Sequence, residues 1–432
     1  MDSVWTKTAS APSFEPLKGD IKTDVLIIGG GIAGLLCAHF MAEKNIDYVL
    51  TEAKTICSGI TKNTTAKITA QHGLIYHSLI KKYGVHKAGL YLQANLRALE
   101  KYRELCSKID CDFEAKDAFV YSTDDKSKID RELEALKMLN FEAQFEDSLP
   151  LPFPIKGALR FKDQAQFDPL KFAYGIAKPL RIFEHTKVRH LLPQKAMTDH
   201  GSISAKKIII ATHFPILNKH GGYFIKLHQH RSYVLALKNA QAIDGMYVDE
   251  SESGLSFRSY KDMLLLGGGS HRTGKQGGSF NELERFSKQH YPNAAIAARW
   301  ATQDCMTLDG IPYIGQYSKS TPDLYAATGF NKWGMTSAMA AADILSDMVQ
   351  GKQNICASVF DPSRSVFHPQ LLINAKETTL SLITPTAPRC PHMGCALKYN
   401  KAEHSWDCPC HGSRFTKDGR LIDNPSTDDK RM

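Results

Sequence analysis

The sequence predicts an α/β fold with two lobes, followed by a small all-β domain at its C-terminal end. Three observations predict this fold. A strand, a glycine-rich turn, a helix and a second strand follow one another over residues 24–51. Alternating stretches between residues 223 and 269 are typical of an antiparallel sheet. Cysteines and histidines then gather between residues 390 and 411.

The remaining elements follow from apolar periodicity along the chain. Nearly continuous apolar runs predict buried parallel strands at 24–28, 47–51, 206–211 and 324–328. Helical spacing predicts helices over 32–44, 77–108, 125–139 and 336–350, the last ended by Gly351. Residues 1–22 and 352–389 show little periodicity, and we expect a loose lead-in and a linker there.

Composition excludes several classes of protein. The chain carries a net charge of +9, but the positive residues are spread out and form no basic stripe, so nucleic-acid binding is not expected. No secretory signal is visible at the N-terminus, and we expect a cytoplasmic protein. The uncharged run 25–42 has a glycine-rich centre, which indicates a buried strand–turn–helix and no membrane span.

The glycine-rich turn predicts a dinucleotide site. Gly29 permits the tight turn, Gly31 lets a phosphate approach the backbone, and Gly34 lets the helix pack against the strand. The helix start at Ile32 and Ala33 then offers free N–H groups to a pyrophosphate. Glu52 ends the second strand, where a carboxylate accepts hydrogen bonds from ribose hydroxyls.

A second strand-to-helix turn, residues 329–336, indicates that the dinucleotide is FAD. Its helix N-terminus would stabilise the negative charge of a reduced flavin ring, with Thr336 or Ser337 as the helix cap. The residues of this turn that we expect near the cofactor are Gly329, Trp333, Gly334, Met335 and Thr336. An ordinary glycine-rich turn is the alternative.

These motifs, with the Thr61–Lys67 loop, residues 309–315 and residues 327–330, resemble the D-amino-acid oxidase/glycine oxidase superfamily of FAD enzymes. The resemblance implies removal of a hydride from a carbon next to an amine nitrogen, without a protein base. It implies cofactor contacts at Thr61, Thr65 and the backbone of Val188. It also implies a domain over 1–351, with an FAD lobe at about 20–90, 150–220 and 300–351 and a substrate lobe at about 91–149 and 221–299.

Two Arg-Ser-Tyr segments offer a clamp for a substrate carboxylate. Residues two apart in a strand share a face, so Arg231 with Tyr233, and Arg258 with Tyr260, could point the same way. His271 and Arg272 are further candidates. A solvent-facing cross-strand pair is the alternative, and the catalytic residues stay unknown.

The C-terminal residues 390–432 resemble a Rieske [2Fe–2S] domain, reached through a linker at 352–389. Cys390-x-His392 and Cys408-x-x-His411 match the pattern in which two thiolates bind one iron and two imidazoles the other. The resemblance also implies a disulfide between Cys395 and Cys410. Against this resemblance we expect an abridged domain, because only the linker precedes the first cluster loop, where a Rieske domain usually carries several strands. A structural zinc site using a different four of the six groups is the alternative.

The leading function hypothesis is an amine or amino-acid dehydrogenase that sends electrons from FAD through the cluster to a partner protein or quinone. Rieske centres lie at roughly −150 to +300 mV, so this flow is downhill. The alternatives are an O₂-using amine oxidase with a vestigial C-terminal module and a redox sensor. A Rieske oxygenase would need a mononuclear iron site of two histidines and a carboxylate, for which no clear candidate exists.

Overall fold

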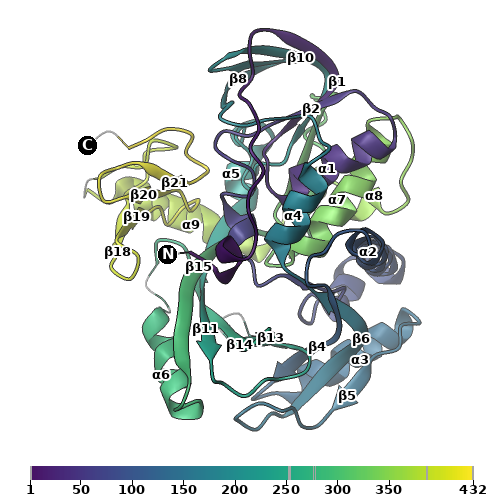
Figure 1. Ribbon diagram of the computed structural model, residues 1–432, viewed down its shortest axis with the longest axis vertical. Helices are drawn as coiled ribbons and strands as arrows, with labels where there is room; N and C mark the ends of the chain where they lie inside the picture. The colour runs from purple at the N-terminus through teal and green to yellow at the C-terminus, as the bar shows by residue number, and fades with distance from the viewer. Residues whose placement is uncertain (1, 252–253, 276, 278, 386–387, 431–432) are drawn as a thin grey trace.

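The computed structural model describes residues 2–251, 254–275, 277, 279–385 and 388–430. The expected domain ends at residues 1 and 432 therefore lie outside the described residues. The α/β class is confirmed, with two sheets in the main part of the chain and a third in the C-terminal domain (Figure 1).

The first sheet has eight strands, and its central strands run parallel because β1 pairs with β2 and β10 in the same direction. Its strands are β1 (Ile21–Ile28), β2 (Tyr48–Thr51), β7 (Ile182–Phe183), β8 (Val188–Leu192), β9 (Lys195–Thr198), β10 (Gly201–Ile210), β16 (Tyr313–Gln316) and β17 (Leu324–Thr328). Val25 and Ile27 pack with the helices α1 (Ile32–Glu43), α4 (Pro169–Ala177) and α7 (Gly334–Met348). Leu26 and Ile28 pack on the opposite face, because successive side chains of a strand alternate.

The second sheet has nine strands and is antiparallel except where β12 pairs with β4. Its strands are β3 (Lys67–Ile68), β4 (Glu114–Ser122), β5 (Gln144–Glu146), β6 (Gly157–Gln166), β11 (Leu227–Lys238), β12 (Met246–Asp249), β13 (Ser256–Tyr260), β14 (Met263–Arg272) and β15 (Ala295–Thr307). The helices of this part are α2 (Tyr76–Cys106), α3 (Lys126–Met138) and α6 (Phe280–His290).

The lobe boundaries differ from those expected. Strands β6 and β15 belong to the second sheet, whereas residues 150–220 and 300–351 were assigned to the FAD lobe. The lead-in also differs, because residues 4–7 form the 3₁₀ helix η1 (Val4–Lys7) and its Trp5 side chain is fully buried. Two further 3₁₀ helices are η2 (Ile60–Asn63) and η3 (His220–Gly222).

The C-terminal domain is a small antiparallel sheet lying beside the first lobe (Figure 1). Its strands are β18 (Lys398–Asn400), β19 (Ser405–Asp407), β20 (Arg414–Thr416) and β21 (Leu421–Asp423). The expected linker is not structureless, because it contains α8 (Ala357–Phe360) and α9 (Pro369–Ile383). Helix α9 packs near α5 (Tyr223–Lys226). The sequence did not predict α9, because its large apolar residues are exposed and form no core-facing side of a helix.

Candidate active site and metal centre

The turn between β1 and α1 has the geometry of a phosphate cradle. Gly29 has a φ of +111°, which disfavours side chains, and a Cβ on Gly34 would lie 1.9 Å from the Gly29 carbonyl oxygen. Gly31 faces the Thr61 hydroxyl, and Thr61 Oγ1 accepts a hydrogen bond of 3.0 Å from the Ile32 N–H. A side chain would therefore be strained at Gly29 and would collide at Gly34, whereas Gly31 has an ordinary φ of −77° and room for a Cβ.

A cavity of about 1240 Å³ opens on this turn. That volume exceeds the roughly 300–1,000 Å³ of common ligand pockets, and it suits an extended dinucleotide. The predicted cofactor residues that line the cavity are Gly29, Gly31, Ile32, Ala33, Glu52, Thr61, Thr65, Val188, Trp333, Gly334 and Met335. Gly34, Gly329 and Thr336 are not part of its lining.

Glu52 lies at the end of β2, as predicted, with its carboxylate turned toward the glycine turn. Its Oε2 accepts a hydrogen bond of 2.7 Å from the Gly30 N–H, and its Oε1 accepts one of 2.8 Å from the Lys54 N–H. Burial raises the pKa of this carboxyl above its usual value. The carboxylate is thus fixed in place at the cavity wall.

Thr336 is not the helix cap that the sequence predicted. Helix α7 begins at Gly334, its N-cap is Trp333, and no side chain caps it. The Thr336 hydroxyl instead donates to the Thr69 carbonyl at 3.1 Å and lies 2.9 Å from Nε2 of His72. A backbone N-terminus therefore faces the cavity at Gly334 and Met335.

Sequence reasoning missed two residues beside this helix N-terminus. His72 stacks on Trp333 with the ring centroids 5.1 Å apart, and burial lowers its pKa to about 3, which keeps the imidazole neutral. Lys67 lines the cavity, and burial and then the charge of Arg258 lower its pKa to about 7. Lys67 ends the Thr61–Lys67 loop and His72 follows it, so the resemblance of this loop to the FAD family could have pointed to both residues.

The proposed substrate clamp is corrected by the structure. Arg258 is fully buried and donates to the Thr65 and Ala66 carbonyls at 2.8 Å, and Tyr260 donates to Asp112 at 2.8 Å. Neither residue lines the cavity. Arg231 and Tyr233 do line it, but the Arg231 guanidinium pairs with Glu403 of the C-terminal domain. Arg258 and Tyr260 are therefore too far inside the protein to clamp a substrate in this cavity, and the guanidinium of Arg231 is already paired with Glu403.

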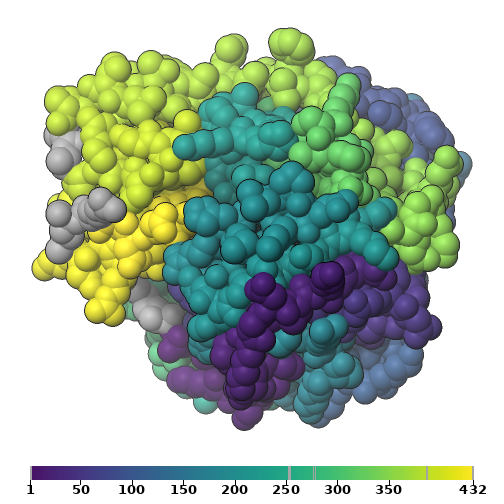
Figure 2. Space-filling model, turned by 90° about the horizontal axis from the view of Figure 1, so that it is seen from above, coloured from purple at the N-terminus to yellow at the C-terminus, as the bar shows by residue number. Residues whose placement is uncertain are grey.

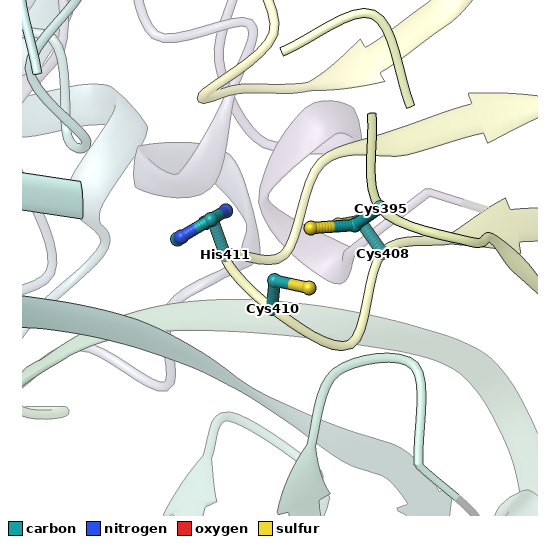
Figure 3. Close-up of side chains that lie close together, drawn as sticks. All are labelled: Cys395, Cys408, Cys410 and His411. Atoms are coloured by element: carbon teal, nitrogen blue, oxygen red, sulfur yellow. The ribbon is translucent and has the colours of Figure 1, made fainter. Parts of the chain in front are cut away.

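Four of the six metal-binding candidates meet in one place (Figure 3). The possible ligand atoms of Cys395, Cys408, Cys410 and His411 all lie within 4.8 Å of one another. Cys390 lies close enough to hydrogen-bond to Cys408, and the rings of His392 and His411 are 4.9 Å apart at 89°. The structure therefore brings together the four predicted ligands Cys390, His392, Cys408 and His411 with both remaining cysteines.

The electronic state of these groups fits a metal centre. Hydrogen bonds from Cys390, Cys395 and Cys410 hold the pKa of the Cys408 thiol well below its usual value, so this sulfur favours the thiolate form. Both ring nitrogens of His411, and Nδ1 of His392, are buried without a partner among the described residues. Buried orphaned imidazole nitrogens are costly, and metal ligation would satisfy them.

The disulfide expected between Cys395 and Cys410 is not formed. All ten cysteines of the chain are described, and all are free thiols. The Cys410 thiol instead points to the Glu377 carbonyl of α9, 3.9 Å away.

The two cluster loops dock on the flavin-binding part of the chain. Nε2–H of His392 donates to Asn218 Oδ1 at 2.6 Å, and Arg272 donates to the carbonyls of Pro409 and Cys410 at 3.0 and 2.9 Å. Gln229 donates to the His411 carbonyl at 3.0 Å. Each cluster loop is thus held by side chains from outside the C-terminal domain.

Residues of the C-terminal domain also form one wall of the large cavity. Arg414 and the segment 421–424 line it together with Gly31 and Trp333. The Asn424 amide donates to the carbonyls of Thr212 and Phe214 at 2.6 and 2.8 Å, which closes this wall against the end of β10. The dinucleotide cavity and the cysteine–histidine cluster are therefore neighbours.

Comparison with known proteins agrees with both sites. The chain matches the family described as FAD dependent oxidoreductase (DAO) over residues 24–348 and the Rieske [2Fe-2S] domain over residues 365–431. It is 32% identical to the Rieske 2Fe-2S iron-sulfur protein YhfW of Bacillus subtilis, over 98% of this chain and 96% of that protein. It is 23% identical to gamma-glutamylputrescine oxidoreductase of Escherichia coli, over 78% of this chain and 86% of that protein.

The crystal structure of L-proline dehydrogenase from P. horikoshii has the same fold in the main domain. The TM-score is 0.67 at 19% identity, covering 81% of this chain and 98% of that chain. The predicted cofactors, FAD and a [2Fe–2S] cluster, are confirmed by the two family matches. Among the described residues, no helix has the length and apolar character needed to cross a bilayer.

Proposed function

Because the chain belongs to the family of FAD-dependent oxidoreductases and ends in a Rieske [2Fe-2S] domain, we propose that it is an amine or amino-acid dehydrogenase. Bound FAD supplies hydride acceptance from a carbon next to nitrogen, and the bound [2Fe–2S] cluster supplies one-electron transfer. Electrons then leave for an acceptor protein or quinone. The expected cytoplasmic location stays a prediction.

We assign the FAD to the cavity between the glycine turn and helix α7. Gly29–Gly34 would hold the pyrophosphate, Glu52 the ribose, and Thr61, Thr65 and Val188 the rest of the dinucleotide. The N–H groups of Gly334 and Met335, uncapped by any side chain, would face the ring. A helix N-terminus there favours negative charge on the reduced cofactor.

We assign the cluster to Cys390, His392, Cys408 and His411. The orphaned nitrogens of His392 and His411 support imidazole ligation, and the closeness of the Cys390 and Cys408 sulfurs supports thiolate ligation by both residues. Because Cys395 and Cys410 are free and adjacent, iron and labile sulfide must be measured together with zinc. Two irons and two sulfides for each chain are expected, and one zinc would overturn this assignment.

One observation carries the electron-transfer proposal: the cluster domain forms part of the wall of the FAD cavity. Arg414 and residues 421–424 line the cavity, and His392 hydrogen-bonds directly to Asn218 of the first lobe. A vestigial module would need neither contact. Direct contact between the cluster domain and the FAD cavity favours an internal relay over release of electrons to O₂.

Anaerobic screening of amines and amino acids tests the proposal. Flavin absorbance and the EPR signal of the cluster are followed together after rapid mixing. We expect the substrate to bleach the flavin first and the reduced-cluster signal to rise afterwards. Bleached flavin with a cluster that never becomes reduced, together with fast reoxidation by O₂, would indicate a simple oxidase instead.

A further inference from the structure

Helix α9 is amphipathic in the inverted sense, with its polar residues inside and its apolar residues outside. Gln370, Asn374, Glu377 and Ser381 follow one another at intervals of three or four residues and so share one face. Asn374 donates to the Ile225 carbonyl at 3.1 Å and accepts from Arg272 at 2.8 Å. Glu377 pairs with Lys275 at 2.5 Å. This polar face holds the helix against the molecule.

The opposite face of α9 presents large apolar side chains to the solvent. Leu372 is 74% exposed and Ile383 is 71% exposed, and Ile373 and Leu380 lie beside them on the same face. Phe367, just before the helix, is 88% exposed. Lys376 is exposed between Leu372 and Leu380 on the same face, so this face is mostly apolar with one basic residue, the composition of a helix that binds a membrane surface. Figure 2 shows the yellow-green segment that contains α9 at the surface beside the yellow C-terminal domain.

We propose that this face of α9 docks the protein on an anionic lipid bilayer. The stripe consists of Phe367, Leu372, Ile373, Leu380 and Ile383. An amphipathic helix that lies in the plane of a membrane buries its apolar face in the boundary between headgroups and acyl chains. In α9 the polar face contacts the rest of the protein, whereas in such a helix that face contacts water.

Charge and size favour a bilayer over a second copy of the chain. Lys376 is exposed on the stripe face itself, and the exposed Arg389 lies at the end of α9, where its guanidinium donates to the carbonyls of Ser381 and Leu382. Anionic headgroups attract such a surface. Helix α9 is about 22 Å long, and one helix face about 10 Å wide presents on the order of 200 Å². A stable protein interface needs about 800 Å² from each partner.

The position of α9 gives the docking a consequence for electron transfer. Its Glu377 carbonyl lies 3.9 Å from the Cys410 sulfur, and its Ser381 carbonyl accepts from the Ala396 N–H at 3.1 Å. The bilayer and the cluster loops would therefore lie on opposite sides of α9, about 10 Å apart, the diameter of one helix. If the chain is the dehydrogenase proposed above, oxidation of an amine to an imine yields two electrons and two protons. A lipid-soluble quinone takes up the same number to become a quinol.

Vesicle flotation of the holoprotein tests the inference. The vesicles contain phosphatidylcholine alone or phosphatidylcholine mixed with phosphatidylglycerol. We expect the protein to float with the mixed vesicles, and the double variant Leu372→Glu/Ile383→Glu to partition about ten-fold less. Leu192→Glu is the matched control, because Leu192 is equally apolar, exposed and located on β8 in the first lobe. Lys376→Glu should weaken binding to the mixed vesicles only.

Three results would overturn the inference. The holoprotein could stay in the soluble fraction with both kinds of vesicle, or the double variant could float like the unchanged protein with intact flavin and cluster spectra. Alternatively, light scattering could reveal a dimer that the double variant converts to a monomer, which would make this face a contact between copies. None of these measurements needs turnover. Failure of every amine to bleach the flavin would instead overturn the proposed function alone.

Discussion

Replacing Glu403 by glutamine tests whether a buried ion network fixes the cluster domain on the flavin domain. Arg231 of β11 donates through Nε to Glu403 Oε1 at 2.7 Å, and Arg414 of β20 donates to Glu403 Oε2 at 2.9 Å. The three side chains are 6%, 8% and 3% exposed in the order Arg231, Glu403, Arg414. Glu403 is thus shared between a cation of each domain.

The expected loss follows from burial. Removing one partner of a buried ion pair leaves an uncompensated charge and costs about 3–5 kcal/mol. Glu403→Gln keeps the shape of the side chain and removes the charge, so its effect reports the electrostatics. Asp199→Asn is the matched control, because Asp199 pairs with Arg189 at the surface, where pairs contribute about 0–1 kcal/mol.

The assay is urea unfolding followed by the visible circular dichroism of the cluster and by flavin fluorescence. A double-mutant cycle with Arg231→Met isolates the inter-domain pair, and we expect a coupling energy of about 1–3 kcal/mol. The network would not fix the domain if Glu403→Gln lowered stability no more than Asp199→Asn. Strictly additive effects of Glu403→Gln and Arg231→Met would lead to the same conclusion.

Further predictions concern pH, the two cofactors and Lys67. Although burial raises the pKa of Glu403, hydrogen bonds and charges of Arg231 and Arg414 lower it to about 2, so its contribution to stability is complete above about pH 4.5 and is lost as pH falls toward 2. Acid titration should therefore release the cluster domain in that range, which increased protease cleavage between the domains would reveal. The Glu403→Gln protein should lack this step. Gly34→Ala should abolish FAD retention, because its Cβ would overlap the Gly29 carbonyl, and the ratio of flavin absorbance to protein measures this; full flavin content would contradict the assigned cradle. Cys408→Ser should remove iron and the EPR signal while flavin stays bound, whereas an unchanged signal would exclude this sulfur as a ligand. Burial and the charge of Arg258 lower the pKa of Lys67 to about 7, so the folded state binds this proton less tightly than the unfolded state. Lys67→Met should therefore raise the free energy of unfolding below pH 7, and this increase should shrink toward pH 10. An increase that does not depend on pH would contradict the lowered pKa of Lys67.

The features that were predicted correctly from the sequence depend on short stretches of chain. The turn Gly29–Gly34 and its flanking strand and helix are specified within about two dozen residues, because glycine spacing and apolar runs act locally. The pattern of cysteines and histidines that predicted the [2Fe–2S] cofactor likewise lies on two short loops, and the assignment of single residues as ligands stays a prediction. Such motifs carry their geometry with them, so the fold class and both cofactors could be inferred before any coordinates.

The features that escaped prediction depend on distant contacts. Arg231 and Glu403 are 172 residues apart, and nothing near either residue indicates the partner. Arg258 was expected at a substrate because it shares a strand face with Tyr260 and its guanidinium matches a carboxylate, yet the carbonyls of Thr65 and Ala66 satisfy it inside the protein. In both cases the side chain's role was set by a partner that approaches only after the domains are packed.

Helix α9 shows the same effect in its strongest form. Its large apolar residues face outward, since Asn374 and Glu377 are satisfied by Arg272 and Lys275 on the inner side. A prediction that expects apolar residues to be buried therefore places the wrong face of α9 against the protein or predicts no helix there. The polar partners lie on β14 and in the segment that follows it, the part of the chain that also holds the Pro409 and Cys410 carbonyls. The helix and the cluster loop consequently share one support, so a change at Arg272 should disturb both the orientation of the exposed stripe and the setting of the metal centre.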